Sequence, residues 1–124
     1  KKIPLHNGGT PVRNWLHAKD TAEAVIVLIE SDAQDIIDDN NIYNICGGYE
    51  QTNLYTVEKI LKLYHPGLML NSSQYVDLSY SRQGQDVRYA LNDDKLRSLG
   101  WTPQRVFDKE IGDIVRHYKE NFIW

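Results

Sequence analysis

The chain has 124 residues and a mass of 14.4 kDa, which is enough for one domain with a hydrophobic core and too little for two full domains. Its composition, 41% hydrophobic and 25% charged, is that of a globular protein, and a net charge of −3 argues against a general nucleic-acid or membrane-surface binder. The single cysteine, Cys46, cannot form an internal disulfide, so we expect a cytoplasmic protein.

The first third of the chain predicts two short strands and one helix. Residues 3–5 read as an extended segment, and the alternation over residues 12–17 predicts a strand. Asp20 is a suitable N-cap for a helix over residues 21–30. Residues 31–41 are acidic and polar, which is typical of a solvated loop.

The rest of the chain continues to alternate between predicted strands and helices. We expect, in order, a strand over residues 42–46 that stops at Gly47-Gly48, a helix over 53–64, an irregular stretch over 68–81 with one edge strand, a strand over 87–91, a helix over 93–99 closed by Gly100, and a helix over 106–122. This pattern predicts an α/β fold with a small mixed sheet and helices.

One of these helices has an unusual composition. The run Val25-Ile26-Val27-Leu28-Ile29 is apolar on every side of the helix over residues 21–30. A helix of this kind is expected to be buried on more than one face.

The usual catalytic and metal-binding sequence patterns indicate no catalytic or metal site in this chain. The four histidines lie in different elements without ligand spacing, so we predict no metal site. Cys46 is better explained as a packed strand residue than as a reactive thiol. Tyr55 and Lys59 match a YxxxK pattern and share one helix face, but no glycine-rich dinucleotide turn precedes them, so we interpret them as helix surface. We therefore assign no catalytic residue.

The sequence indicates anion binding more strongly than catalysis or metal binding. Arg13 lies on a strand between apolar neighbours, where an unpaired cation is costly. Asn53 stands at a helix start, where free N–H groups attract phosphate. Arg82 and Arg88 flank Gly84, which lets backbone approach a ligand closely. Each arginine alone is better explained by a structural salt bridge, and the three features together leave structural pairing and a phosphorylated ligand both open.

Segments along nearly the whole chain resemble the dTDP-glucose 4,6-dehydratases. Residues 12–24 resemble their VRDWLYVEDHARA segment, 42–48 their YNIGG, 51–54 their TNL, 82–90 their RPGHDRRYA, 99–103 their LGWxP, and the last helix through Trp124 their EWY…W ending. Related epimerases and decarboxylases share the first and the LGWxP patterns. The TNL and RPGHDRRYA patterns point more narrowly to the dehydratase.

The resemblance implies a fold and a reaction. Members are extended short-chain dehydrogenases that hold NAD in an N-terminal Rossmann domain, oxidise the sugar at C4, remove water across C5–C6 and reduce C6. Residues 1–124 would then be the C-terminal substrate-binding region, without the Rossmann domain and inactive alone. The parent would be an NAD-dependent lyase, cytoplasmic and homodimeric, with a nucleotide diphosphate sugar as ligand and no nucleic acid or membrane partner.

The resemblance also implies binding residues. Arg13, Asn53 and Arg82 match positions that hold the nucleotide diphosphate, and Gln85 stands where the family has a histidine that faces the phosphates. The NAD-binding glycines, the YxxxK pair and the Asp-Glu dehydration pair of the family have no counterpart here, so the resemblance implies no catalytic or cofactor-binding residue in this chain. In the family, the helix that follows the first segment docks on the Rossmann sheet, so we expect the helix over residues 21–29 to show an uncovered apolar face.

Several positions depart from the family pattern. Gln83 replaces a proline, Gln85 the histidine, Val87 the first of two paired arginines, and Asn14 the aspartate of RDW. Glutamine can donate a hydrogen bond but carries no charge. A diphosphate ligand is still expected, while the base and sugar stay open. The alternatives are the same region of a nucleotide-sugar epimerase or decarboxylase, and a non-catalytic nucleotide-binding or assembly module.

Overall fold

The computed structural model describes residues 1–31, 42–67 and 71–122. The loop expected over residues 31–41 falls outside this range except for its first residue, and Trp124 of the resemblance also lies outside. Across the described part, no helix has the length and apolar character needed to cross a membrane.

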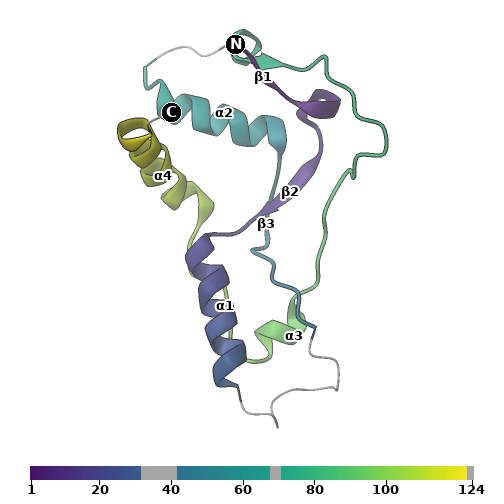
Figure 1. Cartoon of the computed structure of the whole chain (residues 1–124), viewed down its shortest axis with the longest axis vertical. Coiled ribbons are helices and arrows are strands. Elements are labelled where there is room, and N and C mark those ends of the chain that lie inside the picture. The colour runs from purple at the N-terminus through teal and green to yellow at the C-terminus, as the bar shows by residue number, and fades with distance from the viewer. Residues whose placement is uncertain (32–41, 68–70, 123–124) are drawn as a thin grey trace. The chain divides into compact units, whose positions relative to one another are not determined.

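Helices and short strands alternate along the chain, which confirms the α/β class (Figure 1). The helices are α1 (Ala18–Glu30), α2 (Asn53–Tyr64), α3 (Asp94–Arg97) and α4 (Phe107–Asn121), with 3-10 turns η1 (His6–Gly9) and η2 (Ser72–Gln74). The strands are β1 (Ile3–Pro4), β2 (Val12–Trp15), β3 (Tyr49–Thr52) and β4 (Val76–Asp77).

The strands form two small sheets. β1 pairs with β4 in parallel, with Ile3 opposite Val76 and Pro4 opposite Asp77. β2 pairs with β3 in the second sheet. β4 is the edge strand expected within residues 68–81, and the expected small sheet is thus divided into two separate pairs.

The chain divides into two compact units, each with its own core. The first unit comprises residues 1–13, 50–89 and 108–124, and the second comprises residues 14–49 and 90–107. Leu5, Leu61 and Val76 form the buried core of the first unit. Ala24, Leu96 and Trp101 form that of the second.

α2 and α4 have the bounds that periodicity predicts, within a residue. Helical spacing of apolar side chains over fifteen residues is the most dependable sequence signal for a helix, and α4 carries it. The apolar stripe of this helix consists of Phe107, Ile111, Ile114, Val115, Tyr118 and Phe122, and only Val115 of these is buried. All of them except Phe107 help to line a groove of about 570 Å³ shared with Ile60 and Tyr64 of α2.

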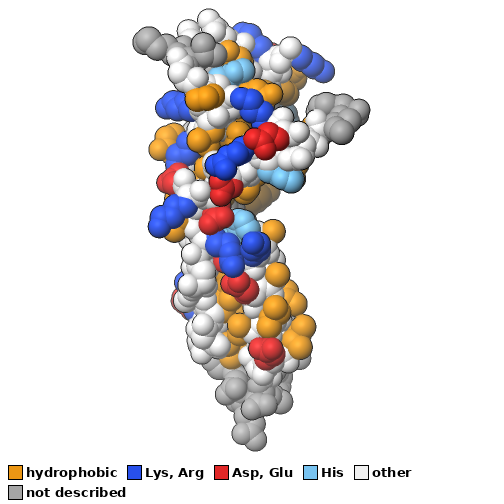
Figure 2. Space-filling model, turned by 90° about the vertical axis from the view of Figure 1, so that its left-hand side faces the viewer, with side chains coloured by type: hydrophobic (Ala, Val, Ile, Leu, Met, Phe, Trp, Pro, Cys, Tyr) orange, Lys and Arg blue, Asp and Glu red, His pale blue; other side chains and the backbone are white. Residues whose placement is uncertain are grey.

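α1 buries one face and exposes another. Ala24 is fully buried in the second core, while Val25 is 45%, Ile26 50% and Ile29 78% exposed. The prediction that this helix is buried on more than one face is therefore wrong. The prediction that it shows an uncovered apolar face is confirmed. Figure 2 shows hydrophobic side chains gathered on the surface of the second unit.

Asp20 is not the N-cap of α1. The cap is His17, whose Nδ1 accepts a hydrogen bond from the backbone N–H of Lys19 at 3.1 Å. Asp20 lies in the first turn with its side chain fully buried. Its carboxylate accepts hydrogen bonds from the backbone N–H groups of Gln104 and Arg105, at 3.2 and 3.1 Å, and pairs with the Arg105 guanidinium.

The strand expected over residues 42–46 is wrong, because the strand begins only at Tyr49. Residues before it are held by side chains instead of a ladder: Tyr43 and Ile45 pack on the second core. Gly47 lies so close to β2 that an added Cβ would come within 2.3 Å of the Trp15 carbonyl oxygen. The close approach, and not a strand end, explains this glycine.

Two further expected elements are shorter in the structure. The strand over residues 87–91 is reduced to a single parallel bridge between Val12 and Arg88. The helix over residues 93–99 is limited to α3, and Gly100 follows with a left-handed φ of 90°. Short segments give few periodic positions, so their bounds are set by packing.

We expect Arg105→Ala to destabilise the protein by about 3 kcal/mol, because it leaves the buried Asp20 carboxylate without its counter-ion. Urea unfolding followed by circular dichroism measures the change. Arg116→Ala is the matched control, since its pair with Asp113 is exposed and should contribute less than about 0.5 kcal/mol. Equal losses in the two variants would contradict the structural role of Asp20.

The same carboxylate makes stability depend on pH. Burial opposes the ionisation of Asp20, but hydrogen bonds from the Arg105 and Gln104 backbone and from the Arg105 side chain outweigh it, so its pKa lies below the ordinary 3.8. The unfolded chain therefore takes up this proton at a higher pH than the folded chain. The contribution of Asp20 is complete above about pH 4 and is lost as the pH falls through the lower, folded pKa.

Unfolding midpoints of the wild type and Asp20→Asn between about pH 6 and pH 2.5 measure this effect. The wild type should lose its advantage as the pH drops below about 4. Parallel curves over the whole range would show that Asp20 contributes no linked stability.

Candidate anion-binding site

The candidate site is built on residues 7–13 of the first unit, and the first segment tied to them is the loop that carries Arg82. The backbone N–H of Asn7 donates to the Tyr80 carbonyl at 2.8 Å. The Asn7 side chain accepts from the Arg82 N–H at 2.8 Å and donates to the Arg82 carbonyl at 3.1 Å. This two-way contact fixes the backbone of Arg82, although the two residues are 75 positions apart.

A second tie fixes the end of the same loop. The backbone N–H of Val12 donates to the Val87 carbonyl at 2.8 Å, next to the bridge between Val12 and Arg88. The loop is thus held at both ends, and its middle, around Gly84 with a φ of 71°, lies between the two ties.

The third segment is the start of α2. The backbone N–H of Asn53 donates to the Pro11 carbonyl at 3.1 Å. Gly9 lies so close to Leu54 that an added Cβ would come within 2.8 Å of the Leu54 side chain. Residues 7–13 therefore carry Arg13 themselves and position both Asn53 and Arg82.

The Arg13 guanidinium is half-buried and oriented without a carboxylate. It donates to the Val12 carbonyl at 2.7 Å and to the Asp86 carbonyl at 3.3 and 3.2 Å. Its central carbon lies 4.3 Å from the centre of the Tyr89 ring. Within the described part of the chain Arg13 has no ion pair, and its role in anion binding stays a prediction.

Arg82 is exposed, and only its backbone is held. A hydrogen bond to Asp86 and the charge of that carboxylate raise the pKa of Tyr89, while the positive charges of Arg13 and Arg82 act in the opposite direction. The contact between Asn7 and the Arg82 backbone ties the residue to the segment that carries Arg13.

The remaining arginines are already paired. Of the six in the sequence, four contact carboxylates, and the pairs are Arg88 with Glu50, Arg97 with Asp93, Arg105 with Asp20 and Glu23, and Arg116 with Asp113. Of the two explanations that the sequence leaves open, Arg88 thus fits the structural salt bridge, with a bidentate contact to Glu50. Among the described residues, only Arg13 and Arg82 are arginines with no ion pair.

Asn53 is the first residue of α2, as predicted, but its backbone N–H is not free. The cap residue is Thr52, whose hydroxyl accepts from the Tyr55 N–H at 3.2 Å, and the Asn53 N–H is used by Pro11. The expectation of a free N–H group at this residue is therefore wrong. The half-buried Asn53 side chain forms no hydrogen bond within residues 1–31, 42–67 and 71–122, so its amide is the group that a ligand could use.

Gln85 has a partner that the sequence does not indicate. Its side-chain oxygen lies 3.3 Å from Nδ1 of His6, whose ring stacks on Tyr80 with centroids 6.3 Å apart. His6 is one of the four histidines that lack metal-ligand spacing in the sequence. His6 lies beside Gln85 because the fold brings together two segments that are 79 positions apart in the sequence. Local sequence patterns cannot predict such a contact.

The other candidate groups are structural. The Lys59 ammonium lies 4.6 Å from the Tyr55 ring and pairs with Asp108, which supports the interpretation of this pair as helix surface. Cys46 is buried. In the described ranges no cluster of three His, Cys, Asp or Glu side chains could hold a metal ion.

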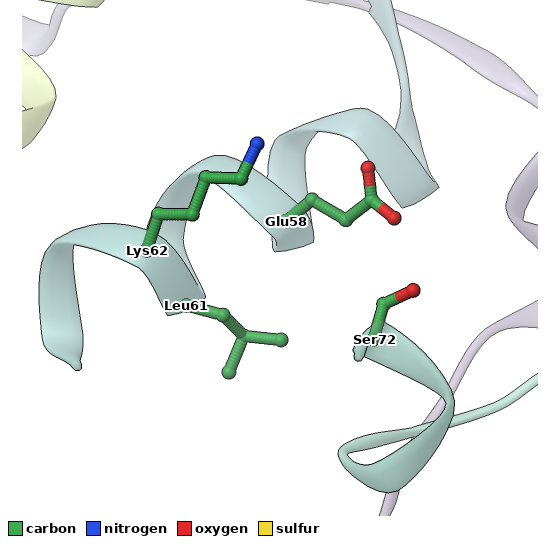
Figure 3. Close-up of a pocket in the computed structure, with 4 residues that line it drawn as sticks. All are labelled: Glu58, Leu61, Lys62 and Ser72. Atoms are coloured by element: carbon green, nitrogen blue, oxygen red, sulfur yellow. The ribbon is translucent and has the colours of Figure 1, made fainter. Parts of the chain in front are cut away.

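A small pocket between α2 and η2 is not the ligand site. Figure 3 shows Glu58, Leu61, Lys62 and Ser72 around it, with the Glu58 carboxylate on the side of Ser72. Its volume is about 110 Å³, whereas pockets for cofactors and comparable ligands are usually ~300 Å³ or larger. It is too small for a nucleotide.

Comparisons with known proteins cover nearly the whole chain. A family model described as GDP-mannose 4,6 dehydratase matches residues 1–114. A low-salt glycan biosynthesis protein of Haloferax volcanii is 32% identical over 94% of this chain, and a dTDP-glucose 4,6-dehydratase of Escherichia coli is 32% identical over 100% of it. Both alignments cover 34% of the relative.

A solved structure shows the same fold. The dTDP-glucose 4,6-dehydratase DesIV of Streptomyces venezuelae, with NAD and TYD bound, superposes with a TM-score of 0.77 at 30% identity. The match covers 97% of this chain and 34% of that one. The chain therefore spans about a third of the length of the relatives that it matches.

We expect Asn7→Gly to loosen the loop that carries Arg82. Glycine keeps the positive φ of 51° at this position without strain and removes only the side-chain hydrogen bonds. Amide exchange at Arg82 should accelerate by about tenfold or more. The Val12 amide, bonded to Val87, is the internal control and should keep its protection. Unchanged exchange at Arg82 would show that Asn7 does not hold the loop.

Proposed function

This chain belongs to the GDP-mannose 4,6 dehydratase family, and from that premise we propose that it forms the nucleotide-sugar-binding region of a dTDP-glucose 4,6-dehydratase. Membership places it among nucleotide-sugar dehydratases and epimerases. The finer assignment rests on the site in the first unit and on the identity of the relatives.

The observation that carries the proposal is that some arginines are paired with carboxylates and others are not. Four are paired with carboxylates, while Arg13 and Arg82 have no ion pair among the described residues and lie on segments that Asn7 and Val12 tie together. Two guanidinium groups with free donors suit the oxygens of a diphosphate, because charge-assisted hydrogen bonds from arginine can be bidentate. The diphosphate of the ligand would lie between them.

Asn53 and Gln85 would complete the binding set with neutral donors. The Asn53 amide stands at the positive end of the α2 dipole, which favours a negative group nearby. Gln85 can donate through its Nε2 while its oxygen faces His6. Neither residue adds charge, so we assign the electrostatic part of binding to the two arginines.

In this proposal the chain binds and orients the substrate, and the redox chemistry belongs to NAD. NAD supplies a hydride acceptor and donor, which the removal of water through a 4-keto intermediate requires. The described residues do not fit a dinucleotide, because none of their glycine turns opens an α-helix after a strand. In this proposal NAD would therefore be held by a Rossmann domain of the whole protein and not by these residues.

A second candidate is the same region of a nucleotide-sugar epimerase or decarboxylase. Gln85 and Val87 favour it, since both lack the charge present at these positions in the dehydratase pattern. The preferred base separates the two candidates: thymine favours the dehydratase, and uracil favours the alternative.

Titration calorimetry of the purified protein with dTDP and UDP tests the proposal. We expect dTDP to bind more tightly, and Arg13→Ala or Arg82→Ala to weaken it by about tenfold or more, as loss of a hydrogen bond to a charged group implies. Arg116→Ala, which removes an exposed paired arginine, should leave affinity unchanged. If the wild type binds neither nucleotide, or if both site variants bind normally, the proposed function is wrong.

A further inference from the structure

We propose that Tyr89 is the positioning residue that holds the Arg13 guanidinium ready for the ligand's phosphates, an inference that rests on the proposed function. Arginine has a long side chain that loses much of its rotamer freedom when it is fixed. A binding arginine that is fixed before the ligand arrives avoids that loss during binding. The structure shows how Arg13 is fixed.

The Tyr89 ring covers one face of the guanidinium. The distance of 4.3 Å from the guanidinium carbon to the ring centre is that of a cation–π contact. The backbone carbonyls of Val12 and Asp86 accept from the two Nη atoms in the guanidinium plane. One flat face and one edge are therefore occupied, which leaves Nε–H and a second hydrogen on Nη2 for a ligand.

Asp86 acts on both partners of this contact. Its backbone carbonyl accepts from the Arg13 guanidinium, and hydrogen bonding to its carboxylate, together with the charge of that group, raises the pKa of Tyr89. The Tyr89 ring is half exposed, so its face is open to the guanidinium. The contact with Arg13 is made by the ring itself, so the phenol hydroxyl is not required for it.

An aromatic face suits this role better than a carboxylate. A carboxylate, as Arg105 has in Asp20, would neutralise the cation and occupy its donors. A tyrosine ring attracts the guanidinium but adds no negative charge, so the positive field remains for the ligand. Within the described residues, the Asp86 carboxylate forms no ion pair with Arg13, which contacts only the backbone carbonyl of that residue.

Nuclear magnetic resonance of the Arg13 side chain tests the positioning without any nucleotide. In the wild type and in Tyr89→Phe, the Nε–H proton should be shifted upfield by the ring, and this shift should disappear in Tyr89→Leu. Tyr64→Leu is the matched control, because it removes another cation–π contact of the same unit, between Lys119 and Tyr64. An Arg13 signal that is identical in the wild type and Tyr89→Leu would overturn the proposal.

Calorimetry with dTDP tests the consequence for binding. Tyr89→Leu should weaken binding by about fivefold, as expected for loss of one cation–π contact, while Tyr89→Phe stays within about twofold and Tyr64→Leu matches the wild type. With Arg13→Ala already present, Tyr89→Leu should add no further loss. Losses that multiply independently would show that Tyr89 does not act through Arg13, and would overturn the proposal.

The two measurements separate the two hypotheses. If dTDP and UDP both fail to bind the wild type, the proposed function fails, while the Arg13 resonance still decides whether Tyr89 holds the side chain. If dTDP binds and the Arg13 signal does not respond to Tyr89→Leu, the positioning role fails and the proposed function survives.

Discussion

The candidate site depends on a set of backbone hydrogen bonds that tie two distant segments to residues 7–13. Among the described residues, the first core contains three buried apolar side chains, which is too few to fix the loop that carries Arg82 and the start of α2 by packing. Hydrogen bonds to Asn7, Pro11 and Val12 do this instead. They bring Asn53 and Arg82 to the strand that carries Arg13.

Charge is used in opposite ways in the two units. In the second unit, Arg105 forms ion pairs with Asp20 and Glu23, so its charge stabilises the fold. In the first unit, carbonyls and an aromatic ring hold Arg13 without neutralising it. The partner of each arginine therefore distinguishes a structural cation from one that can serve a ligand, and this distinction requires the structure.

Sequence reasoning predicts the long helices because their apolar periodicity is set locally, as α4 shows. It fails at residues 42–46, where a short apolar run packs through its side chains and forms no ladder. The binding residues come from the resemblance, since isolated arginines leave two explanations open. Tyr89 is not predicted at all, because its role depends on a contact with Arg13, 76 positions earlier.

The ties that hold the loop have a consequence for how this sequence could diverge. Most of them use main-chain atoms, such as the carbonyls of Val87 and Asp86, which every amino acid supplies. The Val87 side chain is 76% exposed, so exchange of its side chain leaves the Val12 contact in place. The loop can therefore accumulate substitutions while it keeps its path, which lets natural variation alter ligand preference without rebuilding the scaffold.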